Sequence, residues 1–303
     1  MSWSSPIPKS LLAFAVALFV LVMPASAAEE AVIKLLESGT GEKISLRSTP
    51  KKGTSESLLM VMDIDMAMDM GGMGQIPAKL PQMKMLMKAD ITDVKGDQIF
   101  YDFTLVSADL ESEGYDPAMV AAMQPELAKM VGTRGEVVVS TRGITQSAKV
   151  IAPEGTSTDE MAQFENMQKS MNHASAPLPE EPVGVGAKWL VTTNLKENGI
   201  QMQQVVTYTV KSIEGTVVTL DSALVQNAQK QPLAAEGLPP GTKASLDSLD
   251  SKGTGVSIIN LGNLFPTSAT LDHDMKTRMT VQAGEQVMNM GMDMKLALDM
   301  SRK

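Results

Sequence analysis

Apolar and polar residues alternate with a period of two over long stretches of this chain. Three stretches show it: residues 58–70, 83–91 and 288–300. In the first stretch Leu58, Ile64 and five methionines share one phase, and aspartates are common in the other phase. Because successive side chains of a strand point to opposite faces, the pattern predicts long strands with one apolar and one wet face.

Four sequence matches in the same order indicate an internal repeat. Residues 89–106 resemble residues 208–225, and each segment is predicted to form two strands joined by a turn at a glycine. The later matches pair residues 113–117 with 236–240, 135–139 with 255–259, and 147–150 with 268–271. These matches predict two copies of one β-rich unit, over about 54–151 and 186–272.

The expected fold class is mostly β with a few short helices, in which two repeated β-units form one curved antiparallel sheet or an incomplete barrel. The expected segments are a signal peptide (1–27), a first β-unit with an N-terminal segment (28–155), a helix and proline-rich linker (156–185), a second β-unit (186–272) and a C-terminal hairpin that completes the sheet (273–303).

Helices are expected in two places. Residues 157–160 match a capping box, and the apolar residues between Met161 and Met171 lie close to one helical face. A second helical segment is expected from Asp116, with Pro117 at its first position. Pro125 predicts that this segment splits into two short helices.

The first 27 residues are typical of a cleaved secretory signal peptide. Lys9 is their only charged residue, an apolar run spans residues 11–23, and small residues at 25–27 suit cleavage. The run is shorter than the roughly 20 residues that cross a bilayer, and no cysteine follows it for lipid attachment. The mature protein is expected in the periplasm or outside the cell, and not to span a membrane.

Composition excludes several functions. A net charge of -9 argues against nucleic-acid binding, and the absence of cysteine removes thiol nucleophiles and thiolate metal sites. Two histidines and no catalytic motif leave little material for catalysis. The protein is therefore expected not to be an enzyme and to need no cofactor. Its oligomeric state stays open.

The 25 methionines allow two interpretations. Thioether sulfur is a soft ligand for Cu(I), and residues 66–73 and 288–294 resemble the Met-rich segments of periplasmic copper proteins, but without histidine. Leucine and isoleucine in the same phase favour an apolar sheet face instead. The residues expected to line a ligand-binding apolar face are Met60, Met62, Ile64, Met66, Met68, Met83, Met85, Met87, Met290, Met292, Met294, Leu296 and Leu298.

The two histidines are not assigned a function. His273 lies between Asp272 and Asp274, and neighbouring residues of a strand face opposite ways, so the three cannot converge on a metal. The expectation is an exposed polar turn. No metal site is therefore expected.

Two short segments resemble a family of secreted bacterial proteins of unknown function. They are residues 178–189, which lead into a strand at Trp189, and residues 41–53, which end before the first long strand. The resemblance implies no catalytic residues. The succession of long strands is also similar, at the level of fold, to the open half-barrel of LolA- and LppX-type lipoprotein carriers, although fold does not decide function.

The function expected from these features is non-enzymatic binding of a lipid or other apolar ligand on the Met/Leu-rich face. One alternative is a structural or interaction protein of the cell envelope, if that face is a filled core. A Met-rich periplasmic copper-binding protein is the other alternative.

Overall fold

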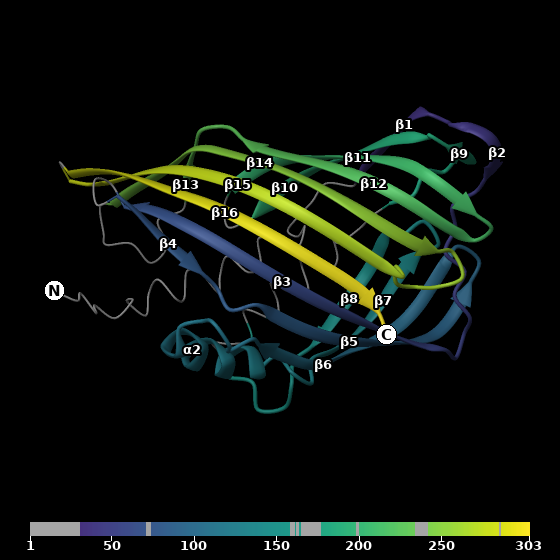
Figure 1. Cartoon of the computed structure of the whole chain (residues 1–303), viewed down its shortest axis with the longest axis horizontal. Helices are drawn as coiled ribbons and strands as arrows, with labels where there is room; N and C mark the ends of the chain where they lie inside the picture. Colours follow the sequence, from purple (N-terminus) through teal and green to yellow (C-terminus); the bar gives the residue numbers. More distant parts are fainter. Residues whose placement is uncertain are drawn as a thin grey trace.

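The computed structural model describes residues 31–70, 74–157, 161, 164, 177–197, 200–233, 242–284 and 286–303. Within them, one antiparallel sheet of fourteen strands dominates the fold (Figure 1). The expectation of a mostly β protein with one large antiparallel sheet is confirmed. The path of the sheet ends at β1 on one side and at β8 on the other, so it is not closed into a barrel.

Five strands from the first part of the chain form one half of the sheet, in the order in which they occur. They are β3 (Ser55–Met70), β5 (Met83–Lys95), β6 (Gln98–Leu110), β7 (Arg134–Ser140) and β8 (Thr145–Ile151). The short strand β4 (Gln75–Lys79) pairs with β3 outside this path.

Five strands from the later part form the other half, also in chain order. They are β10 (Lys188–Glu197), β11 (Ile200–Glu214), β12 (Val217–Ala228), β14 (Thr242–Asn260) and β15 (Ser268–Ala283). Strand β1 (Val32–Glu37) extends this half beyond β10, and β13 (Gln231–Leu233) pairs with β14. The interpretation of the two halves as copies of one unit stays a prediction.

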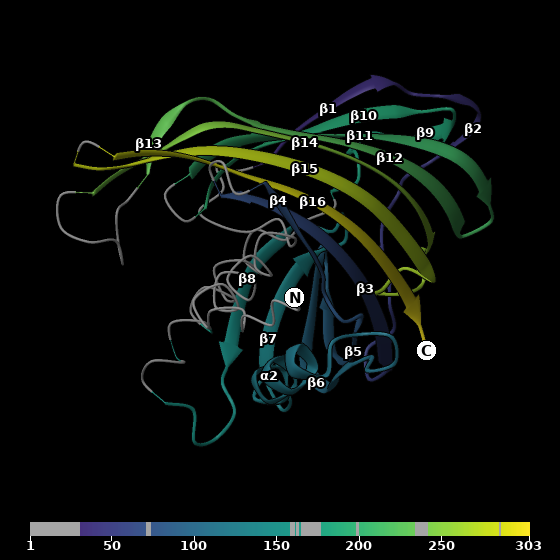
Figure 2. The ribbon, with the colours of Figure 1, turned by 60° about the vertical axis from the view of Figure 1, so that its left-hand side comes forward.

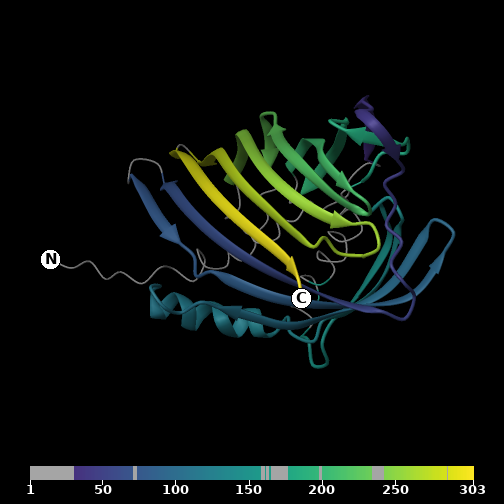
Figure 3. The same ribbon diagram turned by 45° about the vertical axis from the view of Figure 1, so that its right-hand side comes forward.

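The C-terminal strand β16 (Gln286–Arg302) joins the two halves. It pairs with β15 from Gln286 to Ser301 and with β3 from Met290 to Arg302. Figure 3 shows it in yellow between the yellow-green β15 and the purple β3. Strand β15 begins at Ser268, inside the segment assigned above to the second unit.

The sheet curves, so that β5–β8 lie below the arch formed by β14–β16 (Figure 2). The inner side of this curve, called here the concave face, carries the apolar phase of the long strands. Glu56 lies at one end of this phase, and its carboxylate accepts hydrogen bonds from the backbone N–H groups of Leu264 and Phe265, at 2.8 and 3.0 Å. This contact ties β3 to the β14–β15 connection.

The helix α2 (Pro117–Ala128) packs on the concave face. Asp116 caps it by accepting a hydrogen bond from the N–H of Ala118. The expectation of two short helices is wrong, because α2 continues through Pro125. Burial of Met119, Met123 and Leu127 in the core compensates for the hydrogen bond that proline removes.

The helix expected over 161–171 falls almost entirely outside the described residues. Of this segment the structure describes only Met161 and Phe164, and the side chain of Phe164 is buried. The signal peptide expected at 1–27 also lies outside them.

Candidate functional site

The main apolar cluster covers the concave face across both halves of the sheet. It contains Leu58, Met60, Met62, Ile64 and Met66 of β3, Met83 and Met85 of β5, and Met292, Met294 and Leu296 of β16. From the other half it contains Leu195, Met202, Ala228, Leu246, Leu249 and Met275. Residues that are far apart in the sequence therefore belong to one continuous buried apolar cluster.

Most of the residues expected from the sequence belong to this cluster. Met68, Met87 and Leu298 are partly buried and pack against it. Met290 is half-buried and is not a member, and Met288 beyond it is 49% exposed, because β16 there extends past the packed part of the sheet. The apolar face predicted from the alternation thus agrees with the observed burial of Met292, Met294 and Leu296.

Pairing between strands brings thioethers into a row. Met294 on β16 lies directly opposite Met275 on one side and Met66 on the other. All three side chains are at least 93% buried. Side chains directly opposite each other in antiparallel strands have Cβ atoms about 4.5–5.5 Å apart, so the three methionine side chains start from neighbouring positions.

A row of polar side chains continues the same line into the other half of the face. Ser251 lies opposite Met275, Gln226 lies opposite Ser251, and Gln204 lies opposite Gln226. The amide nitrogen of Gln226 donates to Oε1 of Gln204 at 2.7 Å, and the hydroxyl of Ser251 donates to Oε1 of Gln226 at 3.2 Å. The Ser251 hydroxyl also contacts Nε2 of His273. These four residues are called here the polar row.

The polar row is buried between two apolar clusters. Along β10, Trp189 and Val191 belong to a second cluster, whereas Leu195 belongs to the main one. The four polar side chains are between 3% and 9% exposed. Burial of polar groups is costly unless they are hydrogen-bonded, so the bonds within the row are needed for stability.

His273 is not in an exposed turn, and that expectation is wrong. It lies within β15 in the apolar phase, opposite Gly253. A Cβ atom at Gly253 would lie 3.2 Å from Cδ2 of the imidazole, so this glycine makes room for the ring. Burial lowers the pKa of His273 below its usual 6.5, opposed by the nearby Asp274 carboxylate, and favours the neutral ring.

Thr277 adds a further polar atom to the face. It lies on β15 two steps beyond Met275, opposite Leu249 and Met292. Its hydroxyl is buried and has no hydrogen-bond partner within the described part of the chain. The pattern of the sequence did not predict buried Gln, Ser, Thr and His here, although all of them lie in the apolar phase of their strands.

Two open grooves lie on the other, outer face of the sheet. The larger, of about 430 Å³, is lined mainly by Thr, Asp and Ser side chains of β11, β12, β14 and β15. The smaller, of about 290 Å³, lies over β6, β7 and β8. Neither groove contains the residues of the concave face discussed above.

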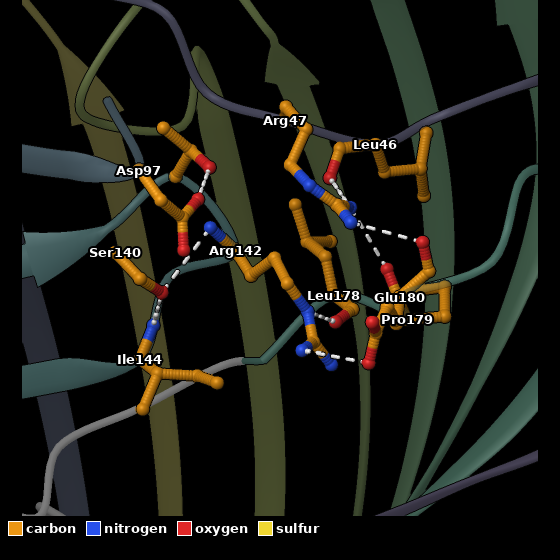
Figure 4. Close-up of polar contacts among 10 residues, drawn as sticks. Leu46, Arg47, Asp97, Ser140, Arg142, Ile144, Leu178, Pro179 and Glu180 are labelled. Atoms are coloured by element: carbon orange, nitrogen blue, oxygen red, sulfur yellow. Dashed lines mark hydrogen bonds and ion pairs between the residues drawn. The ribbon is translucent and has the colours of Figure 1, made fainter.

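The two segments that carry the resemblance to a known family contact each other (Figure 4). Arg47 donates hydrogen bonds to the carbonyl groups of Pro179 and Glu180, at 3.0 and 2.9 Å. Arg142 donates to the carbonyl of Leu178 at 2.9 Å. Strands β2 (Thr40–Ile44) and β9 (Val183–Val185) also pair. Both segments therefore have a structural role in holding the connection that leads into Trp189.

Trp189 anchors the end of this connection. Its indole N–H donates to the carbonyl of Pro177 at 3.1 Å, and its ring stacks on Tyr208 with centroids 5.3 Å apart. Burial raises the pKa of Tyr208 to about 12. The stacked rings of Trp189 and Tyr208 thus form one apolar end of the concave face.

The described residues contain no group of three or more His, Cys, Asp or Glu side chains placed to hold a metal ion. They also contain no helix that is long and apolar enough to cross a membrane.

Comparison with known proteins gives one family match. Residues 159–266 match a family of unknown function, DUF6263, which agrees with the expected likeness to a family of unknown function. No curated protein matches the chain.

Several solved structures show a weak likeness. OccK9 (OpdG) of Pseudomonas aeruginosa is 7% identical with a TM-score of 0.24, over 82% of this chain and 98% of that chain. OccAB4 of Acinetobacter baumannii is 6% identical with a TM-score of 0.21, over 84% and 99%. OmpT, an outer membrane protein of Vibrio cholerae, is 6% identical with a TM-score of 0.19, over 82% and 100%. At such scores the likeness carries no argument, and these structures give no support to the expected similarity to LolA- and LppX-type carriers.

Proposed function

We propose that this protein is a non-enzymatic binding protein of the periplasm or the extracellular space, and that it holds an acyl chain or a similar apolar ligand on its concave face. The observation that carries the proposal is the continuous Met/Leu surface, which extends from β5 across β3 and β16 to β15. A stable core needs burial, but it does not need so many methionines.

The abundance of methionine on the concave face supports binding of ligands that differ in shape. Methionine is unbranched and polarisable, so it packs against irregular apolar shapes and adjusts when the shape changes. Met60, Met62, Met83 and Met85 are buried in the free protein. The ligand therefore enters by rearrangement of this packing, which methionine permits more readily than β-branched residues do.

The proposed localisation of the protein, in the periplasm or outside the cell, is based on the first 27 residues. Their charge and apolar run suit secretion, and cleavage would release the folded part described above. The absence of enzymatic activity is proposed because the one hydroxyl–imidazole contact of the concave face, between Ser251 and His273, has no third side chain among the described residues that hydrogen-bonds the imidazole and orients it.

Tryptophan quenching by a brominated fatty acid tests the location of the ligand. We choose Met68→Trp, on the concave face at the edge of the cluster, and Asp69→Trp, the next residue on the outer face. Trp189 is present in both variants and serves as a common background. Quenching specific to Met68→Trp is the expected result.

Equal quenching of both tryptophan variants would indicate non-specific adsorption. No quenching in either variant, together with no lipid retained in native mass spectrometry of protein from its own envelope, would overturn the proposal in favour of a filled structural core.

Copper(I) binding is the second candidate, and one observation favours it. The row Met275–Met294–Met66 brings together three thioethers that are scattered along the sequence. Replacement of all three by leucine conserves volume and removes the sulfur atoms. Cu(I) titration against a chelator would show saturable binding by the wild type and none by the variant if this candidate is correct. Unchanged binding of the acyl probe by the variant is expected under the first proposal.

A further inference from the structure

One line of side chains crosses six neighbouring strands of the concave face and changes character halfway. From β11 to β14 it consists of Gln204, Gln226 and Ser251, and from β15 to β3 it consists of Met275, Met294 and Met66. Neighbouring strands lie about 4.8 Å apart, so the line is about 24 Å long. A polar end and an apolar end on one continuous line match the shape of an amphiphile.

The polar end has neutral groups that both donate and accept hydrogen bonds. The bonds between Gln204, Gln226 and Ser251 use Oε1 of Gln204, one N–H and Oε1 of Gln226, and the hydroxyl of Ser251. They involve neither N–H of Gln204. The Thr277 hydroxyl nearby is buried, and no partner reaches it from the described residues. The face therefore has hydrogen-bonding capacity beyond what the contacts among the described residues use.

Charged side chains are nearly absent from the buried set. Among the described residues, Glu56 is the one buried carboxylate, and it already accepts two backbone N–H groups. No lysine or arginine of the described chain is buried. A ligand carboxylate placed on the polar row would find no buried cation among the described residues and would lose its hydration.

We propose that the polar row recognises a neutral hydrogen-bonding head group, an alcohol or an ester, whose acyl chain lies on the methionine end of the same line. This inference rests on the proposed function and names its ligand class: neutral acyl alcohols and esters are preferred to free fatty acids. The neutral state of the buried His273 imidazole is consistent with that preference. A row that serves the fold alone would not distinguish between head groups.

The test compares two ligands with the same chain, monolauroylglycerol and laurate, by isothermal titration calorimetry at pH 7.5. We expect wild-type protein to bind monolauroylglycerol at least about tenfold more tightly, which corresponds to about 1.4 kcal/mol. The double variant Gln204→Met, Gln226→Met conserves side-chain volume and is expected to bring the affinity ratio close to one. Gln203→Met, on the same strand but the exposed outer face, is the matched control and is expected to keep the preference.

The wild-type ratio decides the matter even if the double variant does not fold. A ratio near one, or a preference for laurate, overturns the head-group inference and leaves the proposed function standing. Binding of neither ligand overturns both. Histidine NMR gives a second measurement, since the chain has two histidines: monolauroylglycerol is expected to shift the His273 resonances, and their constancy at saturation would contradict the assignment.

Discussion

The two halves of the concave face have the same strand geometry and different chemistry. On β3, β5 and β16 the inward residues of the main cluster are methionine, leucine and isoleucine, and their neighbours across these strands are of the same kind. On β11, β12, β14 and β15 the inward line also contains Gln204, Gln226, Ser251 and His273, which are joined by hydrogen bonds.

The difference shows what each half is suited to do. Dispersion contacts of methionine are non-directional, so the methionine half tolerates changes of shape. Buried hydrogen bonds are directional and lose much of their energy when one partner is removed, so the polar half specifies one arrangement.

The largest effect is expected from removal of the strand that connects the halves. Truncation after Leu271 removes β16 and most of β15. Strand β3 then loses its pairing with β16 from Leu58 to Met70, and β14 loses most of its pairing with β15. Apolar edges of this length lead to aggregation. Size-exclusion chromatography and thermal unfolding are expected to show aggregated protein without the wild-type transition. A monomer with an unchanged Tm would mean that the halves fold independently.

A charge within the methionine half is expected to have the next largest effect. Met292→Asp places an unpaired carboxylate at a site that is 7% exposed, and it should lower the free energy of unfolding by at least about 3 kcal/mol. Asp293→Ser removes an exposed ion pair with Arg278 and should cost less than about 1 kcal/mol. Urea unfolding measures both, and equal costs would contradict the assigned faces of β16.

Equivalent apolar substitutions should distinguish the two halves. Met85→Leu conserves volume in the methionine half, and we expect a cost below about 1.5 kcal/mol. Gln226→Leu leaves Oε1 of Gln204 and the hydroxyl of Ser251 without their present partner, so a larger loss, of up to about 3 kcal/mol, is expected. Urea unfolding measures both variants. A larger loss of stability for Met85→Leu than for Gln226→Leu would contradict the expected difference between the two halves.

The smallest effect concerns pH and belongs to the polar half alone. Burial lowers the pKa of His273 in the folded protein below its usual 6.5, which applies to the unfolded chain. Between these two pKa values the unfolded chain binds a proton on this imidazole and the folded protein does not. Stability should therefore fall as the pH drops below about 6.5 and stop falling, for this group, below the folded pKa. Unfolding of wild type and His273→Gln from pH 8 to 5 should show a steeper loss for the wild type, and parallel curves would exclude this role of His273.

The sequence by itself predicted the long strands, their inward residues and the mainly β architecture. The reason is that a period of two over residues 58–68 is satisfied by a strand and by no helix, and burial of Met60, Met62 and Met66 follows from it. The alternation also placed Met292, Met294 and Leu296 on the apolar face. It failed at Met290 and Met288, because alternation indicates a face but not how far the packed sheet extends along the strand.

The tertiary structure decided how the predicted hairpins are placed next to each other, and with that the composition of the candidate site. Local sequence does not identify the strand that pairs with the outer edge of a hairpin, so the sequence could not show that Met294 of β16 lies opposite Met66 of β3, or that Gln226 of β12 lies opposite Ser251 of β14. A glutamine in the apolar phase looks unfavourable until its hydrogen-bond partners arrive from other strands. For the same reason the acidic neighbours of His273 suggested a turn, whereas the space above Gly253 and the hydroxyl of Ser251 make its buried place in β15 favourable.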